Sequence, residues 1–330
     1  MTKENTENTD TQMASALRAV AARESVTDIY FVGCGGSYAL MLANQYTVER
    51  EANQINGIAL NSAEFKARAP KRLGKSSVVI LCSHSGATPE TVEAAAIAHK
   101  SGALTIALTH VPGSALNQAS EYTVSYTHAP MTMSSAHSAA ILSRLTFGIL
   151  KVRERNNKAD DLDKALAVLP TIVDRAIEER RAVITEFAES HKREPVIYTM
   201  GSGPNFGIAY SHAICIFQEM QWIHSAAIHA GEYFHGPFEI TDFDVPFIQL
   251  IGVGPSRTID ERAFSFVRKC SKRVTSLDAR DLGASELPQS IAEHVTPLIF
   301  LPVLRAYSEK LAEAKGHPLT VRRYMWKMEY

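Results

Sequence analysis

Short runs of apolar and β-branched residues alternate along the chain with longer segments whose apolar residues recur at helical spacing. The short runs begin at residues 28 and 195 and continue at 77–83, 104–110, 122–128, 245–252 and 273–279. Strands that alternate with helices favour parallel sheets covered by helices on both faces. The pattern therefore predicts an α/β protein.

The two halves of the chain begin in the same way. Residues 28–49 read as a strand, a glycine-rich turn and a helix, and residues 195–220 repeat that order. An internal repeat of this kind predicts two related, doubly wound, Rossmann-like (flavodoxin-like) subdomains with parallel sheets. We expect a frayed or helical start over 1–25, a first subdomain over 26–150, a helical connector over 151–194 with Pro170 as its candidate break, and a second subdomain with a C-terminal tail over 195–330.

Charge and cysteine usage narrow the range of partners. The net charge is −1 and the chain has no basic block, which disfavours a nucleic acid or a membrane surface as a partner. No apolar run approaches the ~20 residues of a membrane-spanning helix, and the polar start lacks the apolar core of a signal peptide. The cysteines are scattered without a CxxC pair, which is typical of unpaired thiols in a reducing cytoplasm. They are Cys34, Cys82, Cys215 and Cys270.

The segment after the run at 77–83 has the chemistry of a phosphate loop. Ser83, Ser85 and Thr88 surround Gly86, and Pro89 suits the first position of a following helix. Hydroxyls beside the free N–H groups of a helix start can bind an anion, although a plain capped turn has the same composition. No lysine follows the glycine, so a nucleotide-triphosphate loop is excluded. The second half lacks this pattern, which predicts one phosphate site per chain.

The glycine turn at 33–39 does not fit a dinucleotide-binding fingerprint. Gly33 and Gly35 match, but the third glycine position is Tyr38. Ser37 in this turn either adds a hydroxyl to a ligand or caps its own helix.

Residues 219–240 hold the densest group of acid and base side chains. Glu219 lies beside an expected helical apolar stripe, where partial burial would make it a general base or a salt bridge would hold it. The stripe consists of Ala209, Ala213, Ile216, Met220 and Ile223. His224, His229 and His235 are not spaced for one helix face, which disfavours a metal site, and HExxH is absent. His235 differs from the other two because it precedes Gly236-Pro237 in a tight turn.

These motifs together resemble the sugar isomerase (SIS) family. The shared features are Ser-x-Ser-Gly-x-Thr after a buried strand, and Glu219 followed sixteen residues later by His-Gly-Pro. The stretches EMQWIHSA, HAGEYFHGPFEITD and HPLTVRRYMWKMEY are most similar to deglycases of phosphorylated fructose–amino acid (Amadori) compounds, particularly those acting on 6-phosphofructose-aspartate.

The resemblance implies roles for individual residues. Sugar phosphate would be bound by Ser37, Ser83, Ser85 and Thr88, with Glu219 as the base and His235 as the acid. Further candidate substrate contacts are Gly35, Gly36, His84, Glu232 and Arg323. Arg322, Arg323 and Lys327 are also candidates to face an acidic amino-acid moiety, although each is more often a solvated surface charge. Glu232 and Glu239 either orient His235 or pair with a cation.

The resemblance also implies a homodimer with its active site built across subunits, and it leaves open whether His235 acts in its own or the neighbouring subunit. Arg323 stands near the position of a lysine that forms an imine in glucosamine-6-phosphate synthases of this family. A guanidinium stays protonated and cannot replace that amine. The implied reaction moves protons next to a C=O or C=N carbon, so no metal or organic cofactor is required.

Two rival functions remain open. An aldose–ketose or aminosugar-phosphate isomerase would use the same acid and base on a substrate without an amino acid. A sensor would bind a sugar phosphate without turnover, but no helix-turn-helix with basic recognition residues is visible.

Overall fold

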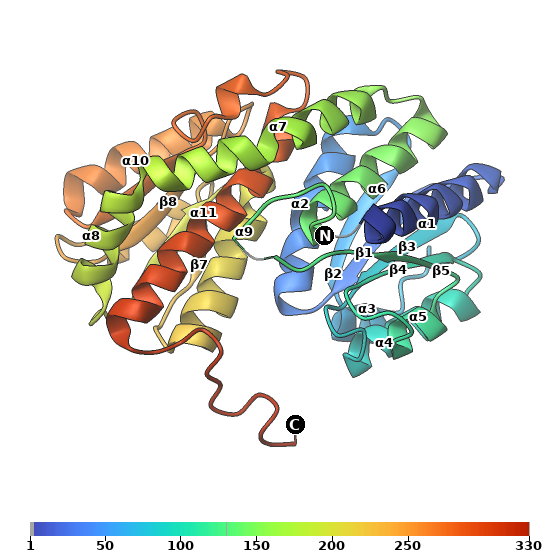
Figure 1. Ribbon diagram of the computed structural model, residues 1–330, viewed down its shortest axis with the longest axis horizontal. Coiled ribbons are helices and arrows are strands. Elements are labelled where there is room, and N and C mark those ends of the chain that lie inside the picture. Colours follow the sequence, from blue (N-terminus) through green and yellow to red (C-terminus); the bar gives the residue numbers. More distant parts are fainter. Residues whose placement is uncertain (1–2, 130, 330) are drawn as a thin grey trace. The chain divides into compact units, whose positions relative to one another are not determined.

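The computed structural model of the protein describes residues 3–129 and 131–329 (Figure 1). They form two compact α/β units. Unit 1 contains the described part of Met1–Ala129 with Ser134–Ala167, and unit 2 contains the described part of Pro130–Met133 with Val168–Tyr330. No helix in the described residues is long and apolar enough to cross a membrane.

Unit 1 is built on a five-stranded parallel sheet of order β2-β1-β3-β4-β5. The strands are β1 (Asp28–Gly33), β2 (Asn56–Asn61), β3 (Ser77–Cys82), β4 (Leu104–Thr109) and β5 (Tyr122–Ser125). Every residue of β1, β3 and β4 is buried, which explains their continuous apolar runs. The edge strand β2 is not among the predicted strands, because its sequence NGIALN is half exposed and contains a glycine.

Six helices of unit 1 form two groups. The helices are α1 (Lys3–Ala22), α2 (Gly35–Glu51), α3 (Ser62–Arg68), α4 (Pro89–Lys100), α5 (Ala115–Ala119) and α6 (Ser138–Glu154). α1 and α2 pack against α6, whereas α3 and α5 pack against α4 (Figure 1). The N-terminal segment is helical over Lys3–Ala22, and Met13, Ala16 and Val20 bury one face of α1. Residues 1 and 2 of that predicted segment lie outside the described residues.

Unit 2 repeats the topology with four parallel strands in the order β7-β6-β8-β9. The strands are β6 (Tyr198–Gly201), β7 (Ala227–His229), β8 (Phe247–Ile251) and β9 (Val274–Asp278). This order matches β2-β1-β3-β4 of unit 1, and it confirms the predicted repeat of doubly wound α/β subdomains. β7 was missed because three residues are too short for a recognisable period.

The remaining elements of unit 2 connect and cover its sheet. The helices are α8 (Arg181–His191), α9 (Phe206–Ser211), the π-helix η2 (His212–Gln221), α10 (Arg257–Cys270) and α11 (Ala292–Lys315). Short 3₁₀ turns are η1 (Gly203–Asn205), η3 (Tyr233–His235), η4 (Pro237–Ile240) and η5 (Ala284–Glu286). α8 packs along α11, where the rings of Phe187 and Tyr307 meet edge to face at 5.3 Å.

The predicted connector does not break at Pro170. α7 (Lys158–Glu179) runs through this proline, and the helical path is interrupted at Arg180, before α8 begins. Leu169, Val173 and Ala176 are buried on one face of α7 on both sides of the proline position. This burial outweighs the one backbone hydrogen bond that proline removes.

Candidate active site

The loop after β3 carries three of the predicted phosphate-binding hydroxyls. Ser83 Oγ and Thr88 Oγ1 lie 2.8 Å apart, and the backbone N–H of Gly86 donates to Ser83 Oγ at 3.1 Å. Gly86 has φ +63°, and a Cβ at this position would overlap the hydroxyl of Ser114. The turn therefore requires glycine for both its backbone conformation and its space.

Thr88 stands at the N-cap position of α4, as predicted, but its hydroxyl does not cap the helix because it bonds to Ser83. Pro89 occupies the first turn. The exposed Ser85 accepts from the N–H of Ala87 at 3.2 Å. The start of α4 thus combines hydroxyls with backbone N–H groups that Thr88 leaves uncapped, an arrangement suited to an anion.

The glycine turn after β1 adjoins this loop. β1 and β3 are neighbours, with Gly33 paired to Cys82, so the turn and the loop meet at the carboxyl edge of the sheet. Gly35, at φ +54°, and Gly36 begin α2, and the hydroxyl of Ser37 hydrogen-bonds the thiol of Cys82. The chain winds to opposite sides of β1 and β3, which is where doubly wound sheets bind ligands.

Three exposed histidines line the same edge, and of these only His84 was a predicted site residue. Its Nδ1 lies 3.2 Å from the hydroxyl of Tyr126, its ring stacks on His110 at 5.2 Å, and it meets the edge of His128 at 4.6 Å. Burial lowers the pKa of His84, and the neighbouring imidazoles lower it further. A signal for this group was available, because the apolar runs at 104–110 and 122–128 both end in histidine.

The corresponding edge of unit 2 is filled by side chains of the protein itself. The buried Asp260 carboxylate accepts from the Ser202 hydroxyl at 2.6 Å and from the Gly252 N–H at 3.0 Å. Burial raises the pKa of Asp260 to about 6, although both hydrogen bonds oppose the rise. A phosphate would meet this carboxylate, so the second edge is unsuited to an anion.

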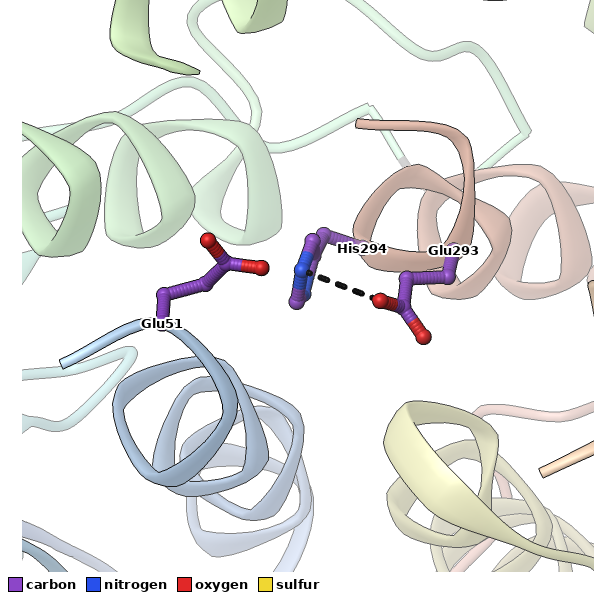
Figure 2. A group of neighbouring side chains, drawn as sticks. All are labelled: Glu51, Glu293 and His294. Atoms are coloured by element: carbon purple, nitrogen blue, oxygen red, sulfur yellow. Dashed lines mark ion pairs between the residues drawn. The ribbon is translucent and has the colours of Figure 1, made fainter. Parts of the chain in front are cut away.

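The first turns of α11 cover that edge. The Thr296 hydroxyl donates to Asn205 Oδ1 at 2.8 Å, and Glu293 lies against Gly254 in the loop after β8. Nε2 of the buried His294 lies 3.6 Å from Oε1 of Glu293 (Figure 2). The second edge is therefore part of the packing of unit 2.

Replacing Asp260 by asparagine is expected to weaken the pH dependence of stability. Because the folded-state pKa of Asp260 is raised above its unfolded value, its contribution is complete below about pH 4 and is lost as the pH rises through about 6. The loss is about 2–3 kcal/mol of unfolding free energy. Asparagine does not ionise, and it can accept from Gly252 while donating to Ser202.

Melting temperatures measured between pH 4.5 and pH 8 check this expectation. The melting temperature of Asp260→Asn should rise relative to that of the wild type as the pH increases. Asp260→Ala is the comparison variant, because it leaves the Gly252 N–H without its acceptor, whereas the Ser202 hydroxyl keeps the Ser256 carbonyl at 3.3 Å. This variant should cost about 1–3 kcal/mol. Parallel pH curves for the wild type and Asp260→Asn would contradict the assignment.

Glu219 lies on the π-helix η2, and its side chain remains 25% exposed. The predicted stripe assumed α-helical spacing and placed Ile216 and Met220 with the buried residues. Both are only half-buried, and Phe217 is fully buried instead, because a π-helix has more residues per turn. The other members of the stripe, Ala209, Ala213 and Ile223, are buried as expected.

Glu219 is both partly buried and ion-paired, so the two alternatives expected for it coexist. Arg322 Nη2 lies 2.8 Å from Glu219 Oε1. Burial raises the pKa of Glu219, while the charge of Arg322 and its hydrogen bond oppose the rise. The carboxylate is therefore more basic than an exposed glutamate, which is the property that a general base requires.

The C-terminal segment reaches the end of η2. Gln221 Nε2 donates to the carbonyl of His317 at 2.8 Å, and the His317 ring meets Trp222 edge to face at 4.5 Å. The Arg323 guanidinium lies 4.2 Å above the ring of Trp222. The residue that contacts Glu219 is thus Arg322, which the sequence offered only as a candidate surface charge or substrate contact.

The three histidines of 219–240 lie on separate elements. His224 forms an isolated bridge with Val196, His229 belongs to β7, and the exposed His235 ends η3. Burial lowers the pKa of His229, and the nearby Glu232 opposes this shift. Glu232 is linked to His235 through the backbone, where the His235 N–H donates to the Glu232 carbonyl at 2.9 Å. Glu239 is exposed on η4.

Comparison with known proteins places this geometry in a family. A family model described as the SIS domain matches residues 24–149. The chain is 45% identical over 307 residues to the fructosamine deglycase FrlB of Bacillus subtilis (strain 168), covering 93% of this chain and 94% of that protein. It is 27% identical over 320 residues to the fructoselysine 6-phosphate deglycase of Escherichia coli (strain K12), covering 96% and 90%.

A crystal structure from Bacillus subtilis, provisionally described as that of a phosphosugar isomerase, matches with a TM-score of 0.94 at 44% identity. The match covers 97% of both chains. The fold and these comparisons define an SIS-type α/β protein. The chain belongs to the SIS family, and its relatives there include the fructosamine deglycase FrlB, as the motifs indicated.

Proposed function

We propose that this protein is a deglycase that releases an amino acid from a 6-phosphofructose–amino acid compound, with 6-phosphofructose-aspartate as the first substrate to test. The observation that carries the proposal is the 45% identity to a fructosamine deglycase over 93% of the chain. The hydroxyl-rich loop beside α4 supports phosphate binding, and the partly buried Glu219 supports proton abstraction.

In the proposed reaction, the loop after β3 and Ser37 hold the sugar phosphate while His235 assists ring opening. Glu219 then removes a proton from C1, and the electron pair forms a C1=C2 bond. The C2=O π bond breaks at the same time, and O2 takes up a proton to give an enaminol. A proton returned to C2 and a proton lost from nitrogen give the C1=N aldimine. Water adds to this bond and releases glucose 6-phosphate and the free amino acid. The positioned acid and base would each contribute about 10²–10⁴ in rate.

Release of glucose 6-phosphate, coupled to its dehydrogenase, tests the proposal. The substrates are 6-phosphofructose-aspartate and 6-phosphofructose-lysine, supplied separately. Turnover of either supports the deglycase, and the ratio of the two kcat/KM values identifies the preferred amino acid. The deglycase proposal would be rejected if neither compound released glucose 6-phosphate while fructose 6-phosphate still raised the melting temperature.

A phosphosugar isomerase is the second candidate function. It is favoured by the description of the solved structure that shares 44% of its sequence with this chain. Such an enzyme would use the same base on a substrate without an amino acid. Conversion of fructose 6-phosphate alone, followed by proton exchange at C1 or C2, would favour it over the deglycase.

We further propose a homodimer in which His235 completes the site of the neighbouring subunit. The exposure of His235 on η3 supports this arrangement. Mixing inactive Glu219→Gln and His235→Ala subunits is expected to restore about a quarter of wild-type activity, because half the dimers are mixed and each has one intact site. If His235 acts within its own subunit, mixing restores nothing.

A further inference from the structure

Contacts within its own segment hold the Arg322 guanidinium in place, independently of its ion pair with Glu219. The residue is only 8% exposed, and its Nη1 donates to the carbonyls of Leu319 at 2.8 Å and Val321 at 2.9 Å. Its Nη2 is then directed to Glu219 at 2.8 Å. A guanidinium with both ends engaged has little rotational freedom, so it fixes the carboxylate with which it pairs.

The segment that carries Arg322 is attached at several points. Lys327 Nζ donates to the carbonyl of Arg322 at 2.6 Å, and the ring of Trp326 lies 5.5 Å from its guanidinium. Upstream, the carbonyl of His317 accepts from Gln221, at the end of the helix that carries Glu219. These contacts join the C-terminal segment to η2 within unit 2.

We propose that Arg322 is a positioning residue for the base of this enzyme: residues 317–327 form a strap that holds its guanidinium against Glu219 and keeps the carboxylate ionised and aligned. The proposal rests on the proposed function, in which Glu219 accepts the C1 proton. Arg322 itself touches no reacting atom. Its role differs from that of Arg323, which stacks on Trp222.

The physical reason is the partial burial of Glu219. A carboxyl group removed from water favours its neutral form, and a protonated acid cannot accept the C1 proton. The titratable groups that face Glu219 are Arg322 from the strap and the Cys215 thiol from its own helix. Burial raises the pKa of Cys215 to about 11, and the thiol therefore stays neutral. The positive charge that faces Glu219 is therefore that of Arg322.

The dependence of kcat/KM on pH tests the proposal in the full-length enzyme. In Arg322→Met the acidic limb of the profile should move to higher pH, so that activity lost at pH 6 is partly regained at pH 9. Arg322→Lys keeps a cation without the planar fork and should give a limb between the two. Arg323→Met removes the same charge from the adjacent residue. The midpoint of its acidic limb should match that of the wild type, irrespective of the level of kcat/KM, since Arg323 is itself a candidate substrate contact.

A measurement without substrate separates this inference from the proposed function. The side-chain carboxyl of Glu219 is followed by ¹³C NMR in glutamate-labelled protein, with Glu219→Gln identifying its signal. The titration midpoint of Glu219 should rise in Arg322→Met and remain near the wild-type value in Arg323→Met. Both results are expected whether or not the protein is a deglycase. An unchanged midpoint in Arg322→Met would overturn the inference, while inactivity of the wild type on both fructosamines would overturn only the function.

The double variant Glu219→Gln/Arg322→Met checks that the pair acts as a unit. Removing Arg322 alone leaves a partly buried carboxylate without its cation, so this single variant should melt at the lowest temperature. Removing both charges should recover part of that loss. Additive losses would show that Arg322 supports the fold independently of Glu219 and would also overturn the inference.

Discussion

Glu219→Gln is expected to lower kcat by about 10²–10⁴-fold, because a carboxamide cannot accept the C1 proton. The substitution keeps the shape of the side chain and one oxygen within reach of Arg322, which lies 2.8 Å from Oε1. Substrate binding through the phosphate loop should survive, since that loop belongs to the other unit of the chain. The rate of glucose 6-phosphate release at saturating fructosamine gives kcat. The rise in melting temperature on adding glucose 6-phosphate reports whether the sugar phosphate still binds.

Glu313→Gln is the matched control for this prediction. Glu313 is an exposed residue of α11 in the same unit, with its carboxylate paired to Lys310 at 2.8 Å. The charge change is the same, and kcat should stay at the wild-type value. Full activity of Glu219→Gln would remove Glu219 from the reaction and with it the proposed chemistry.

Gly86→Ala is expected to abolish productive phosphate binding. The backbone at φ +63° costs an alanine about 1–2 kcal/mol, and the added Cβ overlaps the Ser114 hydroxyl. The Ser114 Cβ would also overlap the added carbon, so rotating the Ser114 hydroxyl does not remove the overlap. The turn that holds Gly86, whose N–H donates to Ser83, must therefore shift relative to Ser114. Losing two charge-assisted hydrogen bonds to phosphate would weaken binding by about 10²-fold or more. KM for the fructosamine and the thermal shift with glucose 6-phosphate measure the effect.

Gly113→Ala separates the backbone penalty from the overlap. Gly113 has φ +69° in the same unit, but nothing lies within 4 Å of where its Cβ would be. Its variant should lose the same about 1–2 kcal/mol of stability and keep its KM. An unchanged KM in Gly86→Ala would show that the loop after β3 does not bind the phosphate.

Local sequence patterns predicted those strands and turns whose conformation depends on the residues of a single element. The apolar runs of β1, β3 and β4 are buried on both faces, so the sequence alone identifies them as central parallel strands. The turn at Gly86 was visible because glycine adopts a positive φ without a steric penalty, and Pro89 marked the start of α4. The edge strands β2 and β7 were missed, since they are half exposed or very short.

The environment of Glu219 could not be predicted from local sequence patterns. An apolar stripe placed the carboxylate near the core, but α-helical spacing could not predict the π-helix that changes which neighbours are buried. Two adjacent arginines, Arg322 and Arg323, look alike in the sequence. Arg322 is buried against Glu219, whereas Arg323 stacks on the exposed Trp222. This difference depends on how the C-terminal segment packs against η2, which precedes it by more than ninety residues in the chain.

Sequence patterns alone predicted the α/β class, the repeated doubly wound halves and the hydroxyl loop around Gly86, and the resemblance to the SIS family added Glu219 and His235 as candidate base and acid. These features depend on residues close together in the chain, where hydrophobic period, glycine and proline act directly on the backbone. The packing of distant segments, by contrast, pairs Arg322 with Glu219, gathers the histidines that follow β3, β4 and β5 beside the loop, and fills the second edge with Asp260. Each of these joins residues that are distant in sequence, and their charges and pKa values depend on burial that packing creates.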